Sequence, residues 1–425
     1  MRVCVVAFTA GLAILILLAV QNPFVSICVS APIQTAGDAM QAASPSTCSG
    51  ATGQKLAKPA SIDTDDERPV VHIGHAICGT VGRDGAGMHF YGFTVVKSAL
   101  QARARSASPR RRFHFHIVVD GGMHALLEDR ARLVRVYPGI VDVFDYVANF
   151  TDGRVQMSIY HVNDVDKAVS TAVGEALAGA ISSRLFRPCA TARLKVPFLQ
   201  EVAAVGKLLW VDWDSVMLCD PANLVDFFEW PEDALIAAAE EMAHSGQVSM
   251  YQGMPAAFNG SGINSGVLLM HLSRMRAVGL NRIWNEEAEI ARAGGYAAPG
   301  LKENAGASHS VDGLAFGDQD ILNILGSNAR HPDWFAVLPP QWNWRQSAHA
   351  SLAMDLRTNA PPGYNPPVPC IEHYAGFQAF GNNVVWPQRA ALYAYVAHQR
   401  LTASSGEDMP VIQTCLPDCV PPLVR

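Results

Sequence analysis

The sequence has no long basic run and no excess of positive charge. Its 425 residues carry 32 Lys and Arg against 38 Asp and Glu, a net charge of −6. A clustered basic surface is the usual footprint of a nucleic-acid-binding protein, so no nucleic-acid partner is expected. The densest positive cluster, Pro109–Arg112, is interpreted as a solvated loop before a strand. No internal repeat is visible either.

A zinc-binding cysteine pattern is also missing, because "CLPDC" has no second pair at a matching spacing. Nine cysteines occur in all, and disulfides are the better interpretation of them. Their number suits the oxidising secretory compartment. The six in the predicted folded region are Cys78, Cys189, Cys219, Cys370, Cys415 and Cys419. Sequence does not choose among the possible pairings.

One long uncharged stretch, residues 3–20, follows Met1 and Arg2. Its length is close to the minimum that spans a bilayer. It could be a signal peptide cleaved after Ala31, although its apolar region is longer than usual. We expect an uncleaved anchor over residues 1–20, because Arg2 precedes it and no Lys or Arg follows before Lys55. This predicts a single-pass type II protein of the Golgi or endoplasmic reticulum membrane with a lumenal domain.

The remaining chain divides by composition. Residues 21–68 are rich in Ala, Ser, Thr, Pro and Gly with almost no aromatics, which predicts a flexible stem. Residues 69–401 carry the regular patterns of one catalytic-size domain, and residues 402–425 are taken as a C-terminal tail. Of the two N-glycosylation tripeptides, at Asn149 and Asn259, we expect Asn149 to be the one modified.

Strand-like and helix-like patterns alternate along the domain. Strands are predicted in "PVVHIGHAIC" (69–78), "FHFHIVVD" (113–120), "VDVFDYV" (141–147) and "KLLWVD" (207–212). Helices are predicted at 89–104, 124–138 and 193–202. This alternation is typical of an α/β domain with a mostly parallel central sheet and helices on both faces. Ligands of such sheets bind beyond the carboxyl ends of the strands, where Cys78, Asp120 and Asp212 are placed.

The stretch "KLLWVDWDSVMLCDP" places Asp212 and Asp214, with Trp213 between them, just after an apolar run. Residues i and i+2 of an extended segment face the same side, so both carboxylates can reach one small target. Hard oxygen ligands suit Mg²⁺ or Mn²⁺, which complete their shells with water and phosphate oxygens. A lone D-x-D tripeptide is common, and both acids could instead cap loops or pair with basic side chains.

Five segments together resemble glycosyltransferase family 8, and its glucoside xylosyltransferase branch in particular. They are residues 184–228 around "DWD", "GINSGVLLMHLSRMR" (262–276), "FGDQDILNIL" (316–325), "LPPQWNWR" (338–345) and "CIEHYAG" (370–376). The resemblance runs from about residue 70 to residue 401. It implies the nucleotide-diphospho-sugar transferase fold called GT-A, and transfer with retention of anomeric configuration.

The resemblance also implies roles for residues at the matching positions. Asp212, Asp214 and His373 resemble the ligands of a Mn²⁺ or Mg²⁺ ion, although a lone His373 would more often be a surface or core histidine. Ala76, Ile77 and Cys78 fall where the family contacts uracil, and their other interpretation is a buried strand end. Arg193 matches an arginine that reaches the nucleotide sugar, with a helix-surface ion pair as the alternative.

The donor sugar is expected near Asn264, Ser265, Asp318, Gln319 and Asp320. The Gln319 amide is a candidate for supporting an oxocarbenium-like transition state, since an amide is a poor nucleophile. Asp320 could instead be an acid favoured by the helix N-terminus. Trp342 and Trp344 in "QWNWR" are assigned partly to the core, or to a platform for a sugar ring.

The expected donor is UDP-xylose and the expected acceptor a glucose already attached to protein, both from the branch resemblance. UDP-glucose or UDP-galactose is the alternative donor. One departure stands out: no Lys or Arg follows His373 before Arg389, and Tyr374 replaces a glycine of the family. A carbohydrate-binding protein that keeps the fold without activity is therefore the alternative from another class.

Overall fold

The structure is a computed structural model. It describes residues 68–78, 93–106, 111–136, 138–151, 153–169, 188–241, 262–285, 318–326, 331–345 and 369–373. All of them lie in one compact unit, Asp63–Arg425. The predicted anchor and tail, the predicted stem except for Arg68, the Asn259 tripeptide and the segment after His373 lie outside the described residues. Among those that are described, no helix has both the length and the apolar character to cross a bilayer.

A seven-stranded sheet forms the centre of the unit, in the order β3-β2-β1-β4-β7-β6-β8. Its first four strands are parallel, and β7 is antiparallel to both of its neighbours. The strands are β1 (Val71–Ile77), β2 (Phe113–Val119), β3 (Val155–His161), β4 (Leu208–Val211), β6 (Ile236–Glu240), β7 (Ile263–Met270) and β8 (Phe335–Val337). All of β4 and β7 is buried, as expected for central strands covered on both faces.

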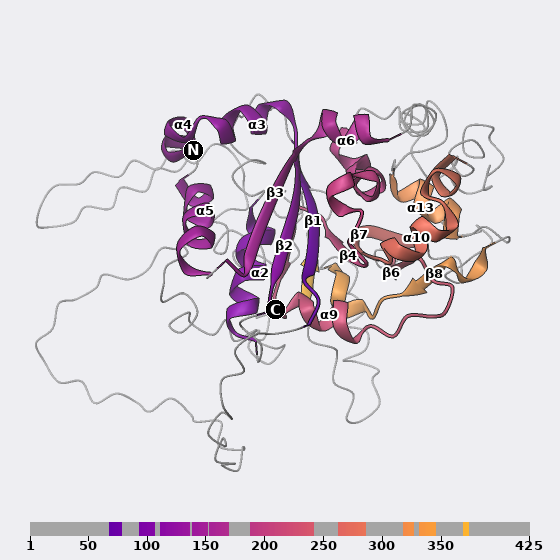
Figure 1. Cartoon of the computed structure of the whole chain (residues 1–425). Coiled ribbons are helices and arrows are strands. Elements are labelled where there is room, and N and C mark those ends of the chain that lie inside the picture. Colours follow the sequence, from indigo (N-terminus) through magenta and orange to yellow (C-terminus); the bar gives the residue numbers. More distant parts are fainter. Residues whose placement is uncertain are drawn as a thin grey trace, which may run out of the picture. The chain divides into compact units, whose positions relative to one another are not determined.

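Helices cover both faces of this sheet (Figure 1). One core contains residues of α2 (Thr94–Ala104), α5 (Pro138–Phe150) and α9 (Pro221–Phe227). The other contains residues of α6 (Val162–Ala168), α8 (Ala192–Lys195), α10 (Leu272–Val278) and α13 (Asp318–Gly326). The predicted α/β domain, with a mostly parallel central sheet and helices on both faces, is confirmed.

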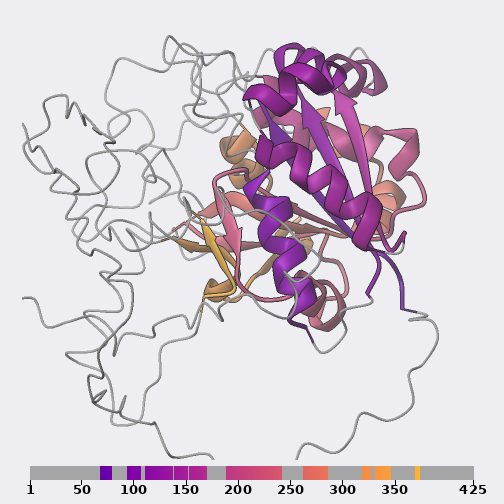
Figure 2. The same ribbon diagram turned by 90° about the vertical axis from the view of Figure 1, so that its left-hand side faces the viewer.

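A second sheet of three short strands has the order β5-β10-β9. Its strands are β5 (Ser215–Met217), β9 (Trp344–Arg345) and β10 (Ile371–His373). Figure 2 shows it beside α2, and the Met217 amide donates to Ser98 Oγ of that helix at 3.0 Å. The described chain also contains shorter helical elements, which include α3 (Gly121–Glu128), α4 (Arg130–Val136), η1 (Pro188–Thr191), η2 (Val196–Phe198), η3 (Gln200–Val202), η4 (Pro332–Trp334) and η5 (Pro340–Asn343).

The strand predicted at residues 141–147 is wrong, because this segment lies in helix α5. Its apolar residues recur at helical spacing, and Ile140, Val143 and Tyr146 are buried. Pro138 begins this helix, where a missing N–H costs nothing, and the helix before it ends at Val136. The third strand of the sheet is "VQMSIYH", Val155–His161.

Two predicted helices are also shorter than expected. The segment 124–138 divides at Asp129, whose carboxylate accepts from the Arg132 amide at 3.0 Å. The segment 193–202 is helical only to Lys195 and then continues as the 3-10 turns η2 and η3. Pro197 has no N–H to extend the α-helix, which accounts for the change.

Candidate active site

The two aspartates of "DWD" lie at the carboxyl end of β4, in the turn that leads to β5. The Asp212 amide donates to the Gly266 carbonyl on the neighbouring strand β7 at 2.7 Å, which fixes where the turn begins. Asp214 is buried, while Asp212 and Trp213 are half-buried. The predicted edge of the sheet therefore holds the acidic pair.

His373 reaches this pair although it is far away in the chain. In the small sheet it is the antiparallel partner of Ser215, the residue after Asp214. One ligand atom from each of Asp212, Asp214 and His373 lies within 4.8 Å of the others. His373 Nε2 is 3.4 Å from Asp214 Oδ1. The structure thus brings together the three residues expected to bind a metal.

The imidazole of His373 is held by a neighbour that the sequence did not single out. Its Nδ1 lies 3.0 Å from Asn343 Oδ1. Because an amide oxygen only accepts, Nδ1 carries the proton and Nε2 keeps its lone pair toward Asp214. This is the outer hydrogen bond that typically orients a metal-binding histidine. Gly266 gives the ring its space: a Cβ there would lie 2.0 Å from His373 Cε1.

Arg193 connects the metal-site acids to α13. Its guanidinium bonds Asp212 Oδ1 at 2.7 Å and Asp318 Oδ2 at 2.9 Å, and it donates to the Ser265 carbonyl. It also lies 5.9 Å from the Trp210 ring centroid. The surface ion pair considered for Arg193 is therefore wrong, because the side chain is buried against the site. Because one oxygen of Asp212 is bonded to Arg193, this arginine would compete with a bound metal for the negative charge of Asp212.

The charges around the site do not balance. The described residues there include four carboxylates and two guanidiniums: Asp212, Asp214, Asp318 and Glu241, with Arg193 and Arg345. Burial raises the pKa of Asp318 to about 6 and also raises that of Asp212, against the opposing charge of Arg193. Burying two uncompensated negative charges is costly. A divalent cation removes that cost, and two carboxylates with one imidazole suit Mn²⁺.

A second group of polar side chains lies beside the acids. Gln319 Oε1 accepts from the Ser265 amide at 3.1 Å and hydroxyl at 3.3 Å, and its Nε2 donates to Glu241 Oε2 at 3.2 Å. Asn264 also donates to Glu241 Oε2, at 2.7 Å. Asn323 fixes α13 beside them, accepting from the Ile263 amide at 2.6 Å. Asn264, Ser265 and Gln319 thus converge, and Glu241 accepts from the amides of Asn264 and Gln319.

Glu241 and Asn343 link this group to the metal-site histidine. Asn343 Nδ2 donates to Asn264 Oδ1 at 2.9 Å, while Asn343 Oδ1 accepts from His373. Glu241 could have been predicted from the sequence as a site residue, because it follows the buried run of β6 as Asp212 follows that of β4. Asn343 lies in "QWNWR", where we considered only the flanking tryptophans. Trp342 is buried in the core and Trp344 is half-buried.

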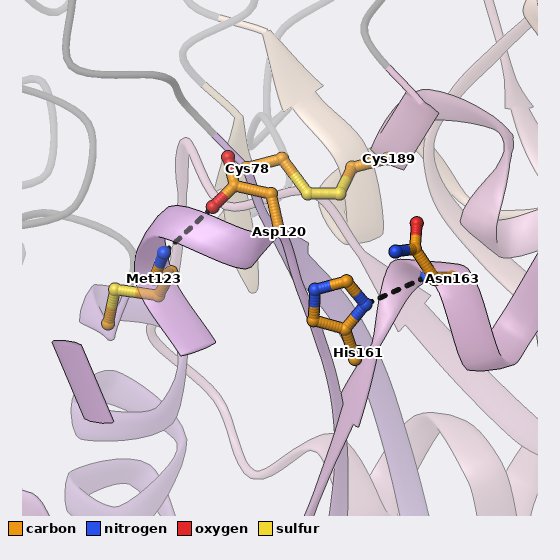
Figure 3. Close-up of a disulfide and its surroundings, with 6 residues drawn as sticks. All are labelled: Cys78, Asp120, Met123, His161, Asn163 and Cys189. Atoms are coloured by element: carbon orange, nitrogen blue, oxygen red, sulfur yellow. Dashed lines mark hydrogen bonds between the residues drawn. A yellow bond between two sulfur atoms is a disulfide. The ribbon is translucent and has the colours of Figure 1, made fainter. Parts of the chain in front are cut away.

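The ends of the first three strands form the neighbouring part of the edge (Figure 3). Ile77 is buried and Ala76 half-buried, while Cys78 is bonded to Cys189, four residues before Arg193. Asp120 caps α3, accepting from the Met123 amide at 2.9 Å. Asp320 lies in the first turn of α13, but its side chain is outside the described part. No contact here shows a uracil site, so that role stays a prediction.

A second disulfide, Cys219–Cys370, joins the segment after β5 to the start of β10, with a Cα–Cα distance of 4.7 Å. We expect the double variant Cys219→Ser/Cys370→Ser to lose about 2–5 kcal/mol of unfolding free energy. Mn²⁺ affinity should fall too, because His373 is three residues from Cys370. Urea unfolding and Mn²⁺ titration measure both. Cys48→Ser, in the predicted stem, is the control. Wild-type stability in the double variant would contradict the expectation.

Comparison with known proteins gives relatives of one kind. Rat glucoside xylosyltransferase 1 is 32% identical over 258 residues, which cover 59% of this chain and 48% of the relative. The mouse protein of that name is 32% identical over 167 residues, 38% of each chain. This chain is a relative of the glucoside xylosyltransferases. The resemblance predicted from the five segments is confirmed, and the matches span less than half of the length of these curated relatives.

Solved structures with a similar arrangement are more distant than these glucoside xylosyltransferase relatives. Mouse xyloside xylosyltransferase 1 in its apo form has a TM-score of 0.48 at 15% identity, covering 75% of this chain and 100% of that one. A galactosyltransferase in complex with donor and acceptor sugar analogues has a TM-score of 0.48 at 17% identity, covering 78% and 97%. No protein-family model matches the chain.

Proposed function

We propose that this protein is a retaining, metal-dependent glycosyltransferase that moves xylose from UDP-xylose onto a glycan, with protein-linked glucose as the acceptor. The observation that carries the proposal is the convergence of Asp212, Asp214 and His373 beside a buried excess of negative charge. The named relatives support the choice of xylose and glucoside. An inactive protein would gain nothing from holding this charge excess.

Asp212, Asp214 and His373 would hold the metal. A bound Mn²⁺ or Mg²⁺ supplies charge neutralisation for a departing diphosphate. Asn343 holds the proton of His373 on Nδ1, so that Nε2 stays a ligand. Arg193 fixes the Asp212 carboxylate from the other side, and its charge opposes the rise that burial causes in the pKa of Asp318. These residues prepare the site before a donor enters it, which is how preorganised electrostatics lowers a barrier.

Gln319, Asn264 and Ser265 are proposed to contact the donor sugar. Glu241 accepts from both amides, and this sets their orientation. An amide oxygen near the anomeric carbon stabilises developing positive charge without forming a covalent bond. Retention then requires attack from the face that the phosphate leaves, with a phosphate oxygen taking the acceptor hydroxyl's proton.

We propose a lumenal location for the domain, on a membrane anchor at residues 1–20. Two disulfides in the described residues support an oxidising compartment. The uncharged residues 3–20 support the anchor.

A donor panel tests the proposed function. The protein is incubated with Mn²⁺, a free glucoside and each of UDP-xylose, UDP-glucose and UDP-galactose, and the transferred sugar is measured by mass spectrometry. Transfer from UDP-xylose, with retained configuration by NMR, is expected. Transfer only from a hexose donor would overturn the xylosyl assignment. Binding of the glucoside without turnover of any donor would favour the non-catalytic alternative.

A further inference from the structure

Three histidines meet on the central sheet, away from the candidate active site. His72 on β1 is the parallel partner of His114 on β2, and His116 follows two residues later on the same face. One ligand nitrogen from each lies within 4.8 Å of the others. Because His72 is five residues before Ile77, the cluster lies about 16 Å from the carboxyl edge of the sheet. It therefore shares no residue with the acidic site.

Two of the ring nitrogens are joined by a hydrogen bond, which a bound ion would replace. His72 Nδ1 lies 3.0 Å from His116 Nε2. Two nitrogens bound to one tetrahedral Zn²⁺ are about 3.4 Å apart, given bonds of about 2.0–2.1 Å. The rings of His114 and His116 are stacked with centroids 4.2 Å apart, so both lie on the same side of the sheet beside His72.

The outer nitrogens already have partners of the kind that metal-binding histidines use. His116 Nδ1 lies 3.0 Å from Tyr160 Oη, and His114 Nε2 lies 2.8 Å from Ser158 Oγ, both on β3. With their protons on these atoms, the opposite nitrogens keep lone pairs for an ion. Such outer hydrogen bonds fix the tautomer and orientation of a ligand.

The surroundings keep the cluster uncharged. His116 is fully buried, and His72 and His114 are half-buried. Burial lowers the pKa of His72 to about 4 and that of His116 to about 3. Neutral imidazole is the form that binds a metal, so no proton has to be displaced at neutral pH.

We propose that His72, His114 and His116 form a second metal site, selective for Zn²⁺ or a similar imidazole-binding ion, that is independent of the metal expected at Asp212 and Asp214. Three histidines leave the fourth tetrahedral position to water or another ligand. An ion bound there would link β1 to β2. Because the three histidines are close together only in the folded chain, binding would stabilise the fold.

The test uses the full chain with Asp212→Asn/Asp214→Asn as its background, so that the acidic site does not contribute. After chelation and dialysis, the protein is titrated with Zn²⁺ against a chromophoric chelator, and with Co²⁺ by visible absorption. We expect one bound ion and the absorption of tetrahedral Co²⁺. No ion bound in this background would overturn the proposal.

Three further variants in that background assign the ligands. His72→Gln should weaken Zn²⁺ binding by more than the roughly 10- to 100-fold expected for Tyr160→Phe, which removes an outer partner. His124→Gln, on α3 outside the cluster, is the matched control and should bind as the background does. Melting with excess chelator checks that each variant folds. Equal affinity in His72→Gln and the background would place the ion elsewhere and refute the assignment.

Discussion

Replacing both Asp212 and Asp214 by Asn should lower sugar transfer by roughly 1,000-fold, since a lost metal removes several kcal/mol of charge stabilisation. Asparagine keeps the size of each side chain but lowers the negative charge of the site, so Mn²⁺ affinity should fall in parallel. The initial rate of transfer from UDP-xylose and the Mn²⁺ dissociation constant are the measurements.

The stability of this variant should change much less than its activity. In metal-free protein the two carboxylates belong to a buried excess of negative charge, which burial already disfavours. Asp220→Asn is a matched control: Asp220 is a buried aspartate six residues on that caps α9, and asparagine caps equally well. Undiminished transfer by the double variant in Mn²⁺ would refute the metal role of the acidic pair.

Gly266→Ala should abolish measurable transfer, although it adds only one methyl group. The new Cβ would lie 2.0 Å from His373 Cε1 and 2.5 Å from its Nδ1. The ring must then move, which breaks its hydrogen bond to Asn343 and takes Nε2 away from Asp214. A displacement of about 1 Å at such a site costs on the order of 100-fold, and loss of the ligand costs more.

Gly206→Ala is the control for this variant, because its Cβ would lie 3.6 Å from Ser273 Oγ, an ordinary contact. It should transfer sugar at the wild-type rate. A His373→Gln variant should resemble Gly266→Ala in both Mn²⁺ affinity and rate if the ring is the cause. Normal Mn²⁺ binding by Gly266→Ala would show that the ring tolerates the methyl group, and would contradict the close fit described for His373.

The fold could be predicted where the pattern had one interpretation. The short runs at β1, β2 and β4, rich in β-branched, aromatic or other apolar residues, are too short and too apolar for surface helices, and all three are strands. The prediction for residues 141–147 was wrong because the five apolar and aromatic residues of this segment fit a strand as well as one face of a helix. Packing of Ile140, Val143 and Tyr146 against the sheet decided for the helix, and that information is not local.

Some residues of the candidate site could likewise be predicted from the sequence, and others could not. Asp212 and Asp214 could be predicted from their place after a buried run, and His373 only through resemblance, since no local rule connects residues so far apart. Glu241 and Asn343 were missed because each acts through a partner on another element: Glu241 through Gln319, and Asn343 through His373. The two disulfide pairings needed the structure as well.

The small sheet has a consequence for biosynthesis. A ribosome delivers the chain from its N-terminus, so β1 to β7 emerge well before residue 373. Strand β5 cannot pair with β10 until that strand has been synthesised. The two strands are far apart in the sequence, and pairing across such a distance is slow. Nascent chains shorter than about 373 residues therefore hold the acidic pair without its histidine. The disulfide between Cys219 and Cys370 can form only after that point, and it then holds β10 next to β5.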